Sequence, residues 1–392
     1  MARISKRVEQ LPPYLFVEIS RKIAAKKAEG KQVITFGIGD PDIPTPDSVL
    51  KRLAETAYDA PNHRYPETEG LPEFRSEVAK WYKSRFDVTV DPATEIMSLI
   101  GAKEGIGHIS LGLLDPGDIA LEPDPAYPVY HVGTLFAGGE SVKIPLSEST
   151  GWLPDFSKIP SDVAEKAKII WLNYPNNPTG AVAPLSFFEE AVAFAKKYDI
   201  AILNDACYTE VYYDDYRPVS ILEVPGAKDV SIEFHSLSKS YNMTGWRIGM
   251  AVGNQELIRA LFLVKSNLDS GASQAIQHMG IAAMQLSDNE IQARNKQYQD
   301  RRDKVVETLQ KIGLDVTPPK ASLYVWAPVP KGHTSASFAT AVLDDLDIVL
   351  TPGSSYGEFG EGYIRLSLTI SDQDLDEGLR RLNTWTIPKG PG

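Results

Sequence analysis

The chain has 392 residues, 43% of them hydrophobic and 23% charged, which is typical of a folded globular protein and excludes a disordered or fibrous one. A net charge of −12 argues against nucleic acid or anionic membranes as partners. One cysteine excludes an internal disulfide, no apolar run reaches the roughly 18 residues of a membrane span, and the first residues lack the apolar core of a signal peptide. We therefore expect a cytoplasmic protein, and the length predicts two domains or one large domain with a lobe.

The first part of the chain combines a helical pattern with a glycine-rich turn. Apolar residues at helical spacing over 16–24 predict an amphipathic helix that ends near Gly30. Residues 33–36 predict a short strand that runs into Gly37-Ile-Gly-Asp-Pro-Asp42. Closely spaced glycines fit either a tight turn or a place where backbone approaches a ligand.

Strand-like and helix-like segments then alternate as far as residue 234. We expect helices at 72–85, after Lys103, after Tyr127 and at 184–198, and strands at 96–100, 119–122, 168–173, 200–203 and 232–234. Such alternation indicates crossover units and a mostly parallel sheet covered by helices on both faces. Ligands of such sheets bind at the carboxyl ends of the strands.

Polar clusters follow each expected strand of this sheet. They are Gly101-Ala-Lys-Glu104, Asp124-Pro-Ala-Tyr-Pro128, Asn173-Tyr-Pro-Asn-Asn-Pro-Thr-Gly180, Asn204-Asp-Ala-Cys-Tyr208 and the segment around Lys239. Taken singly, Asp205 fits a helix N-cap and Tyr127 fits a core tyrosine. Five polar clusters at one sheet edge are hard to explain by caps and turns alone, so we expect a binding site there.

The segment His235-Ser-Leu-Ser-Lys-Ser-Tyr-Asn-Met-Thr-Gly-Trp-Arg247 places Lys239 among small hydroxyl side chains. A lysine that forms an imine with a carbonyl cofactor needs small neighbours, and a cofactor phosphate needs hydroxyls and a fixed cation. Ser236, Ser238 and Arg247 offer both. The alternative is a solvated lysine in a serine-rich loop.

The pattern changes near residue 285 and predicts a second lobe. A long helix carries alternating charges, among them Arg301 and Arg302, which we interpret as a solvated face. Strands are expected at 322–327, 348–350 and 363–368, and helices near 335–346 and 373–384. Arg365 lies among apolar neighbours on one of these strands, where an arginine needs a carboxylate from the protein or from a substrate.

Together these motifs resemble the fold-type I, pyridoxal-phosphate-dependent aminotransferases of the aspartate aminotransferase superfamily over nearly the whole chain. The motifs that carry the resemblance are Asn177-Pro-Thr-Gly180, Asp205-Ala-Cys-Tyr208, Ser236-Leu-Ser-Lys239 with Arg247, and Arg365. The resemblance implies an α/β fold: a mostly parallel seven-stranded sheet covered by helices in a large cofactor-binding domain, plus a smaller α+β domain. It places residues 1–45 in an N-terminal arm and part of the small domain, 46–285 in the large domain and 286–392 in the small C-terminal domain.

The resemblance also implies roles around pyridoxal 5′-phosphate, with no metal. Lys239 would hold the cofactor covalently and move the reacting proton. Asp205 would pair with the ring nitrogen, Tyr208 and Asn177 would bond the phenolic oxygen, and Tyr127 would stack on the ring. The phosphate would be bound by the backbone at Ala102 and Lys103, by Ser236, Ser238 and Arg247, and by Tyr65 of a neighbouring subunit, which implies a homodimer with shared sites.

The implied substrates are an amino acid and a 2-oxo acid, bound by Arg365, Asn177, Tyr127, Gly39, Tyr14 and Lys103. Within the superfamily, the motifs at residues 12–16, 37–42, 174–180 and 241–247 are together similar to those of the LL-diaminopimelate aminotransferases of lysine synthesis. We expect 2-oxoglutarate as the acceptor. One difference is that Thr68 stands where plant-like members carry an acid, although Glu67 and Glu69 flank it. Alternatives are an aspartate- or alanine-type aminotransferase, a β-lyase, or a non-catalytic cofactor-sensing regulator.

Overall fold

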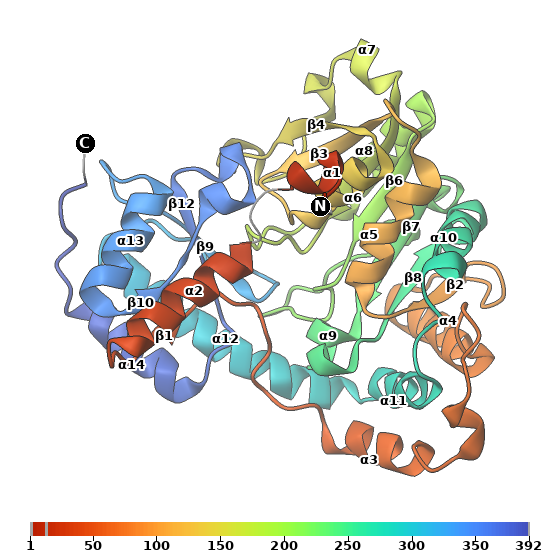
Figure 1. Ribbon diagram of the computed structural model, residues 1–392, viewed down its shortest axis with the longest axis horizontal. Coiled ribbons are helices and arrows are strands. Elements are labelled where there is room, and N and C mark those ends of the chain that lie inside the picture. The colour runs from red at the N-terminus through yellow and green to blue at the C-terminus, as the bar shows by residue number, and fades with distance from the viewer. Residues whose placement is uncertain (1–2, 12–14, 391–392) are drawn as a thin grey trace.

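The computed structural model describes residues 3–11 and 15–390, and Figure 1 shows a larger and a smaller part side by side. The larger part contains a seven-stranded sheet in the order β2 (Ile96–Leu99), β8 (Gly249–Gly253), β7 (Ser231–Ser236), β6 (Ala201–Asp205), β5 (Ala167–Asn173), β3 (Ile119–Asp124) and β4 (Glu140–Pro145). Strand β8 is antiparallel to both neighbours, and the other pairs are parallel. The predicted fold class is confirmed, and β4 and β8 are strands that the pattern did not indicate.

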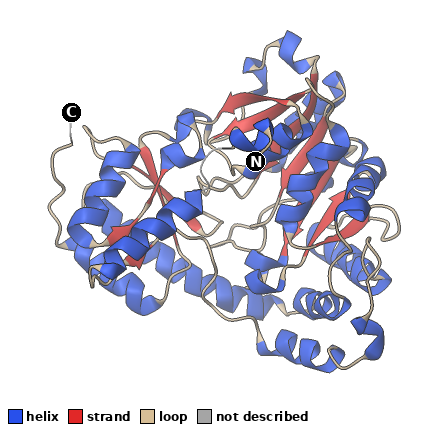
Figure 2. Cartoon of the chain, in the orientation of Figure 1, coloured by secondary structure: helices blue, strands red, loops and turns tan. Residues whose placement is uncertain are grey.

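Helices cover both faces of this sheet, as Figure 2 shows. They are α3 (Asp47–Thr56), α4 (Pro72–Phe86), α5 (Ala102–Leu113), α6 (Val129–Ala137), α8 (Leu185–Tyr198), α10 (Gln255–Leu268) and α11 (Gln274–Met284), with short helices α1 (Lys6–Glu9), α7 (Ser161–Ala164) and α9 (Leu237–Ser240). Side chains of β5 alternate between two buried layers. Ile169 and Trp171 pack with Tyr130 of α6, whereas Ile170 and Leu172 pack in the layer of α8. Burial on both faces explains why the strands read as continuous apolar runs.

The smaller part is built on an antiparallel sheet in the order β11 (Thr351–Pro352), β12 (Tyr363–Ser367) and β9 (Tyr324–Pro328). Its helices are α2 (Leu15–Ala28), α12 (Asp288–Lys311), α13 (Ser335–Leu346) and α14 (Asp372–Asn383). The N-terminal strand β1 (Ile34–Thr35) pairs in parallel with β10 (Ile348–Val349), so the start of the chain belongs spatially with its end. In the described part of the chain, no helix is both long and apolar enough to cross a membrane.

The interpretation of helix α12 as a solvated charged face is wrong for two of its arginines. The Arg301 side chain is 6% exposed, and its guanidinium bonds both carboxylate oxygens of Asp42, at 2.6 and 2.9 Å. The Arg302 side chain is 5% exposed and lies 2.8 Å from Asp214. Helix α12 runs between the two parts (Figure 1), and these acids come from segments far away in sequence. Local charge alternation cannot reveal such partners.

A buried acid, Glu233, lies within the large sheet on β7. It is 1% exposed, accepts a hydrogen bond from the Ser220 hydroxyl and one from Asn204 Nδ2 at 3.3 Å. Burial raises the pKa of Glu233 to about 7, although these hydrogen bonds oppose the shift. The folded protein therefore keeps a proton on Glu233 at pH values where the unfolded chain has released it.

We predict that this proton makes stability depend on pH. Because the folded-state pKa is raised, the stabilisation is complete below the unfolded value and is lost as pH rises through about 7. Relative to Glu233→Gln, which keeps the shape without the titration, wild type should lose about 3 kcal/mol of unfolding free energy between pH 4.5 and 8. Urea denaturation at several pH values measures this, with the exposed Glu165→Gln as control. If the unfolding free energies of wild type and Glu233→Gln changed in parallel with pH, the prediction would be contradicted.

Candidate active site

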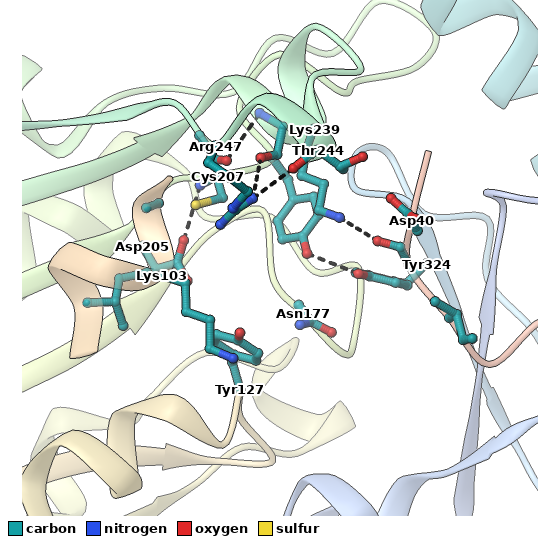
Figure 3. A pocket seen from close by; sticks show the side chains of 17 residues that line it. Asp40, Lys103, Tyr127, Asn177, Asp205, Cys207, Lys239, Thr244, Arg247 and Tyr324 are labelled. Atoms are coloured by element: carbon teal, nitrogen blue, oxygen red, sulfur yellow. Dashed lines mark hydrogen bonds between the residues drawn. The ribbon is translucent and has the colours of Figure 1, made fainter. Parts of the chain in front are cut away.

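A cavity of about 330 Å³ lies at the carboxyl ends of the central strands, between the two parts of the molecule (Figure 3). The sequence motifs predicted to form a site meet here. Its lining includes Gly39, Ala102, Lys103, Tyr127, Asn177, Asp205, Tyr208, Ser236, Ser238, Lys239 and Arg247. These residues follow β1, β2, β3, β5, β6 and β7, so the convergence results from the parallel arrangement of the strands.

Lys239 lies in the short helix α9, which begins directly after β7. The Ser236 hydroxyl caps this helix by accepting a hydrogen bond from the Ser238 N–H at 3.2 Å. Lys239 Nζ extends into the cavity and donates to the carbonyl of Gly39 (Figure 3). A Cβ at Gly39 would lie 2.1 Å from the Tyr324 hydroxyl, so only glycine fits at this contact. The glycine-rich segment is therefore a close backbone approach as well as a turn.

One end of the cavity offers groups that fit a phosphate. The first N–H groups of the twelve-residue helix α5, at Ala102 and Lys103, face a site that Arg247 borders. Arg247 Nη1 donates to the Ser238 hydroxyl at 3.3 Å and to the Thr244 carbonyl at 2.9 Å. Gly101 has φ +71°, and a Cβ there would lie 2.4 Å from Arg247 Nη2. Glycine thus lets the guanidinium lie against the helix start, where cation, hydroxyls and helix dipole attract an anion together.

Asp205 is the last residue of β6, and it lines the cavity. No helix follows it, so it is not a helix N-cap; instead Oδ1 accepts a hydrogen bond from the Cys207 N–H at 3.2 Å. Burial raises the pKa of Asp205, while hydrogen bonds from Cys207 and Tyr130 lower it. A buried carboxylate beside a cavity fits a ligand that carries a positive charge or an N–H group.

Two tyrosines from different parts of the molecule meet across the cavity. The hydroxyls of Tyr208 and Tyr324 lie 3.0 Å apart. Burial raises the pKa of Tyr208 well above its usual value, so its hydroxyl keeps its proton and can donate to a ligand. Tyr127, the expected stacking residue, is half-buried and lines the same cavity, so it is not a core tyrosine.

Arg365 lies behind Tyr324 and is 1% exposed. Nη1 donates to Asn177 Oδ1 at 2.8 Å, and Nη2 donates to the Gly37 carbonyl at 3.0 Å. Its guanidinium carbon lies 4.0 Å from the centre of the Tyr324 ring, and its Nε has no hydrogen-bond partner. Among residues 3–11 and 15–390, no acidic side chain forms an ion pair with it. The sequence predicted a carboxylate partner for Arg365, from the protein or from a substrate. The described residues do not supply this carboxylate.

Of the predicted site residues that the structure describes, Arg365 and Tyr65 are not among those that line the cavity. Tyr65 is 88% exposed on the loop before α4, and its expected contact is with another subunit, so this role stays a prediction. Tyr14 lies outside the described residues. The structure adds lining residues to which no role was assigned, namely Ile38, Asp40, Ile106, Cys207, Thr244 and Tyr324. Ile38, Asp40, Cys207 and Thr244 lie within the motifs, whereas Tyr324 is brought in by packing of the smaller sheet.

A cluster of Glu104, His108 and Asp269 near the start of α5 has donor atoms close enough together to hold a metal ion. Its charge is already compensated by Lys265, whose ammonium lies 3.0 Å from Glu104 and 2.8 Å from Asp269. Lys265 is fully buried, so this cluster is a structural ion-pair network.

Comparison with known proteins identifies the family. The sequence profile of the aminotransferases of class I and II matches residues 31–382. The chain belongs to this family. It is 60% identical over 380 residues to an LL-diaminopimelate aminotransferase from Dehalococcoides mccartyi, covering 97% of this chain and 98% of that protein. An LL-diaminopimelate aminotransferase from Moorella thermoacetica is 53% identical over 378 residues, 96% and 97% of the two chains.

Solved aminotransferase structures share the fold. A substrate-bound structure of BacF from Bacillus subtilis superposes with a TM-score of 0.94 at 36% identity, covering 100% of this chain and 99% of that one. An aspartate aminotransferase variant from Thermus thermophilus gives a TM-score of 0.90 at 26% identity, covering 98% and 99%. This family of enzymes depends on pyridoxal 5′-phosphate, and the cavity suits that cofactor. It combines a lysine, a buried acid, an aromatic wall and an anion site in one space.

Proposed function

We propose that this aminotransferase transfers the amino group of LL-2,6-diaminopimelate to 2-oxoglutarate, giving tetrahydrodipicolinate and glutamate in lysine biosynthesis. The observation that carries the proposal is the buried, uncompensated charge of Arg365. A buried guanidinium bonded only to neutral acceptors favours an anionic partner, and its planar fork suits a carboxylate. α-Amino acids and 2-oxo acids carry that carboxylate next to the reacting carbon.

When bound, pyridoxal phosphate supplies a carbonyl carbon that takes up the amino group and a protonated ring that accepts electrons from the substrate Cα. Lys239 would carry the cofactor and move the proton at Cα, because its Nζ lies within the cavity and, among the described residues, donates to a single backbone carbonyl. Asp205 keeps the ring nitrogen protonated. Tyr208 and Asn177 bond the phenolic oxygen, and Tyr127 stacks on the ring.

The remaining predicted residues bind the two charged ends of the ligands. The phosphate is held by Ser236, Ser238, Arg247 and the backbone of Ala102 and Lys103. The α-carboxylate is held by Arg365, Asn177 and the backbone near Gly39. At the far end of the substrate, Tyr14, Lys103 and acids of the 65–70 loop meet the second ammonium and carboxylate. This set of groups suits diaminopimelate, and the substrate itself is inferred from the names of the relatives.

We further propose a homodimer in which Tyr65 reaches the neighbouring phosphate. The support is an apolar groove of about 830 Å³ that shares Lys103, Tyr127 and Arg247 with the cofactor cavity. Its other lining residues include apolar side chains of α6, namely Val129, Val132 and Phe136, together with Leu111 and Leu268, while α5 also contributes the polar Glu104 and His108. Leu111 and Leu268 are 41% and 57% exposed there, surface that a second copy would cover.

The chain also divides, in our proposal, into an arm and part of the small domain at 1–45, a large domain at 46–285 and a small domain at 286–392. The pairing of β1 with β10 supports the first and third segments belonging together. A cytoplasmic location agrees with the absence of any second cysteine.

We predict that Asp205→Asn retains the cofactor but slows transamination by about 10³-fold or more, because the amide lacks the charge that stabilises the protonated ring. Cofactor content is measured from the visible absorption of purified protein, and rates by stopped flow. An Asp205→Asn enzyme with the wild-type rate would show that the ring nitrogen does not depend on this carboxylate.

We predict that LL-diaminopimelate bleaches the visible band of the bound cofactor faster than other amino acids in single half-reactions. The DD isomer and lysine should react about 100-fold more slowly, because each leaves polar groups of the far pocket without partners. Arg365→Lys is the matched variant, since it keeps the charge but loses the fork, and it should slow every amino acid by a similar factor.

Aspartate or alanine reacting faster than LL-diaminopimelate at equal concentration would contradict the substrate and leave the aminotransferase assignment intact. Ammonia and pyruvate formed without a 2-oxo acid acceptor would instead indicate a lyase.

A further inference from the structure

A tyrosine outside the cavity lining holds the carboxylate of Asp205. Tyr130, on α6, is 1% exposed, and its hydroxyl donates to Asp205 Oδ2 at 2.7 Å. Its ring stacks on Trp171 of β5, with ring centroids 4.6 Å apart and 13° between the planes. Trp171 in turn lies 6.0 Å from Phe234 of β7. Packing against the sheet therefore fixes the hydroxyl of Tyr130, and this hydroxyl fixes Oδ2.

Both carboxylate oxygens of Asp205 accept hydrogen bonds from the protein. Oδ2 accepts from the Tyr130 hydroxyl, and Oδ1 accepts from the Cys207 N–H at 3.2 Å. Donors of this kind favour the ionised carboxylate, whereas burial favours the neutral acid. Asp205 is 4% exposed, so the balance between these two effects decides its charge. The Cys207 N–H cannot be removed by substitution, and the Cys207 thiol, which also lowers the pKa of Asp205, is a weak donor. The Tyr130 hydroxyl is therefore the stronger of the two donors that a substitution can remove.

We propose that Tyr130 is a positioning residue of the aminotransferase: its hydroxyl orients the Asp205 carboxylate and keeps it ionised at neutral pH. The proposal rests on the function proposed above, because it needs Asp205 to meet the cofactor ring nitrogen. Tyr130 itself does not line the cavity. Its ring also packs edge-on against Tyr127, with 5.9 Å between the ring centroids, but its hydroxyl acts through Asp205.

Tyr130→Phe tests this role, because phenylalanine keeps the stacking on Trp171 and removes only the hydroxyl. Without this donor, burial should shift the ionisation of Asp205 to higher pH by about one unit or more. Apoprotein titrated with pyridoxal phosphate at pH 6.5 should then bind about tenfold more weakly than wild type. The ratio of the two dissociation constants should approach one as pH rises toward 9, because high pH restores the charge of Asp205. Ionisation of groups on the cofactor itself affects both proteins equally, so it cancels in the ratio of the two dissociation constants.

Tyr213→Phe is the matched control. Tyr213 is also 1% exposed, and its hydroxyl donates to the Ser322 carbonyl instead of to Asp205. The dissociation constant of Tyr213→Phe for pyridoxal phosphate should stay at a fixed ratio to that of wild type across the pH range, even if the thermal stability of this variant falls. In the Asp205→Asn background, Tyr130→Phe should change neither cofactor affinity nor turnover further, because the carboxylate that it supports is gone.

The outcomes separate the two proposals. A constant ratio between Tyr130→Phe and wild type at all pH values, with wild type binding the cofactor normally, would overturn the role of Tyr130 alone. An additional loss from Tyr130→Phe in the Asp205→Asn background would also overturn it. Failure of wild-type protein to bind pyridoxal phosphate would overturn the function on which it rests.

Discussion

The hydrogen bond from Lys239 Nζ to the carbonyl of Gly39 joins the two parts of this molecule at the cavity. Lys239 follows the central strand β7, whereas Gly39 follows β1, which pairs with the C-terminal part. The contact requires a residue without Cβ at position 39, because the Tyr324 hydroxyl occupies that space. The rest of the site depends on this juxtaposition, since the large sheet supplies the groups that we propose bind the cofactor and the smaller part supplies Arg365.

Charge is distributed unevenly around the cavity. Three charged side chains point at the cavity or lie beside it, namely Asp205, Arg247 and Arg365. None of the three forms an ion pair with a described side chain. Elsewhere buried charges are compensated: Lys265 by Glu104 and Asp269, and Arg301 by Asp42. Asp205 and Arg365 are buried, whereas Arg247 is exposed. Uncompensated buried charge costs stability, so the charges of Asp205 and Arg365 persist where a ligand supplies the partner. The negative Asp205 matches the ring nitrogen of the cofactor. The positive Arg247 matches its phosphate, and the positive Arg365 matches a substrate carboxylate.

The sequence was sufficient to locate the site because a parallel sheet brings its strand ends together. Lys239, Asp205 and Asn177 each follow an apolar run, and that local signal survives without knowledge of the fold. Tyr130 and Tyr324 gave no such signal, because Tyr130 lies within a helix and Tyr324 within a strand of the other part. The charges of α12 wrongly predicted a solvated face for the same reason, because only tertiary structure places Asp42 beside Arg301. Strands β4 and β8 were missed because one is an exposed edge and the other is short and glycine-bounded.

The central claim is that Lys239 carries pyridoxal phosphate. The most direct measurement is borohydride reduction of the purified, coloured protein, followed by protease digestion and mass spectrometry of the peptides. The account predicts one pyridoxyl group per chain, on the peptide that contains Lys239, and none in a Lys239→Ala variant. Stoichiometric modification of a different lysine, or transamination by Lys239→Ala at the wild-type rate, would contradict it.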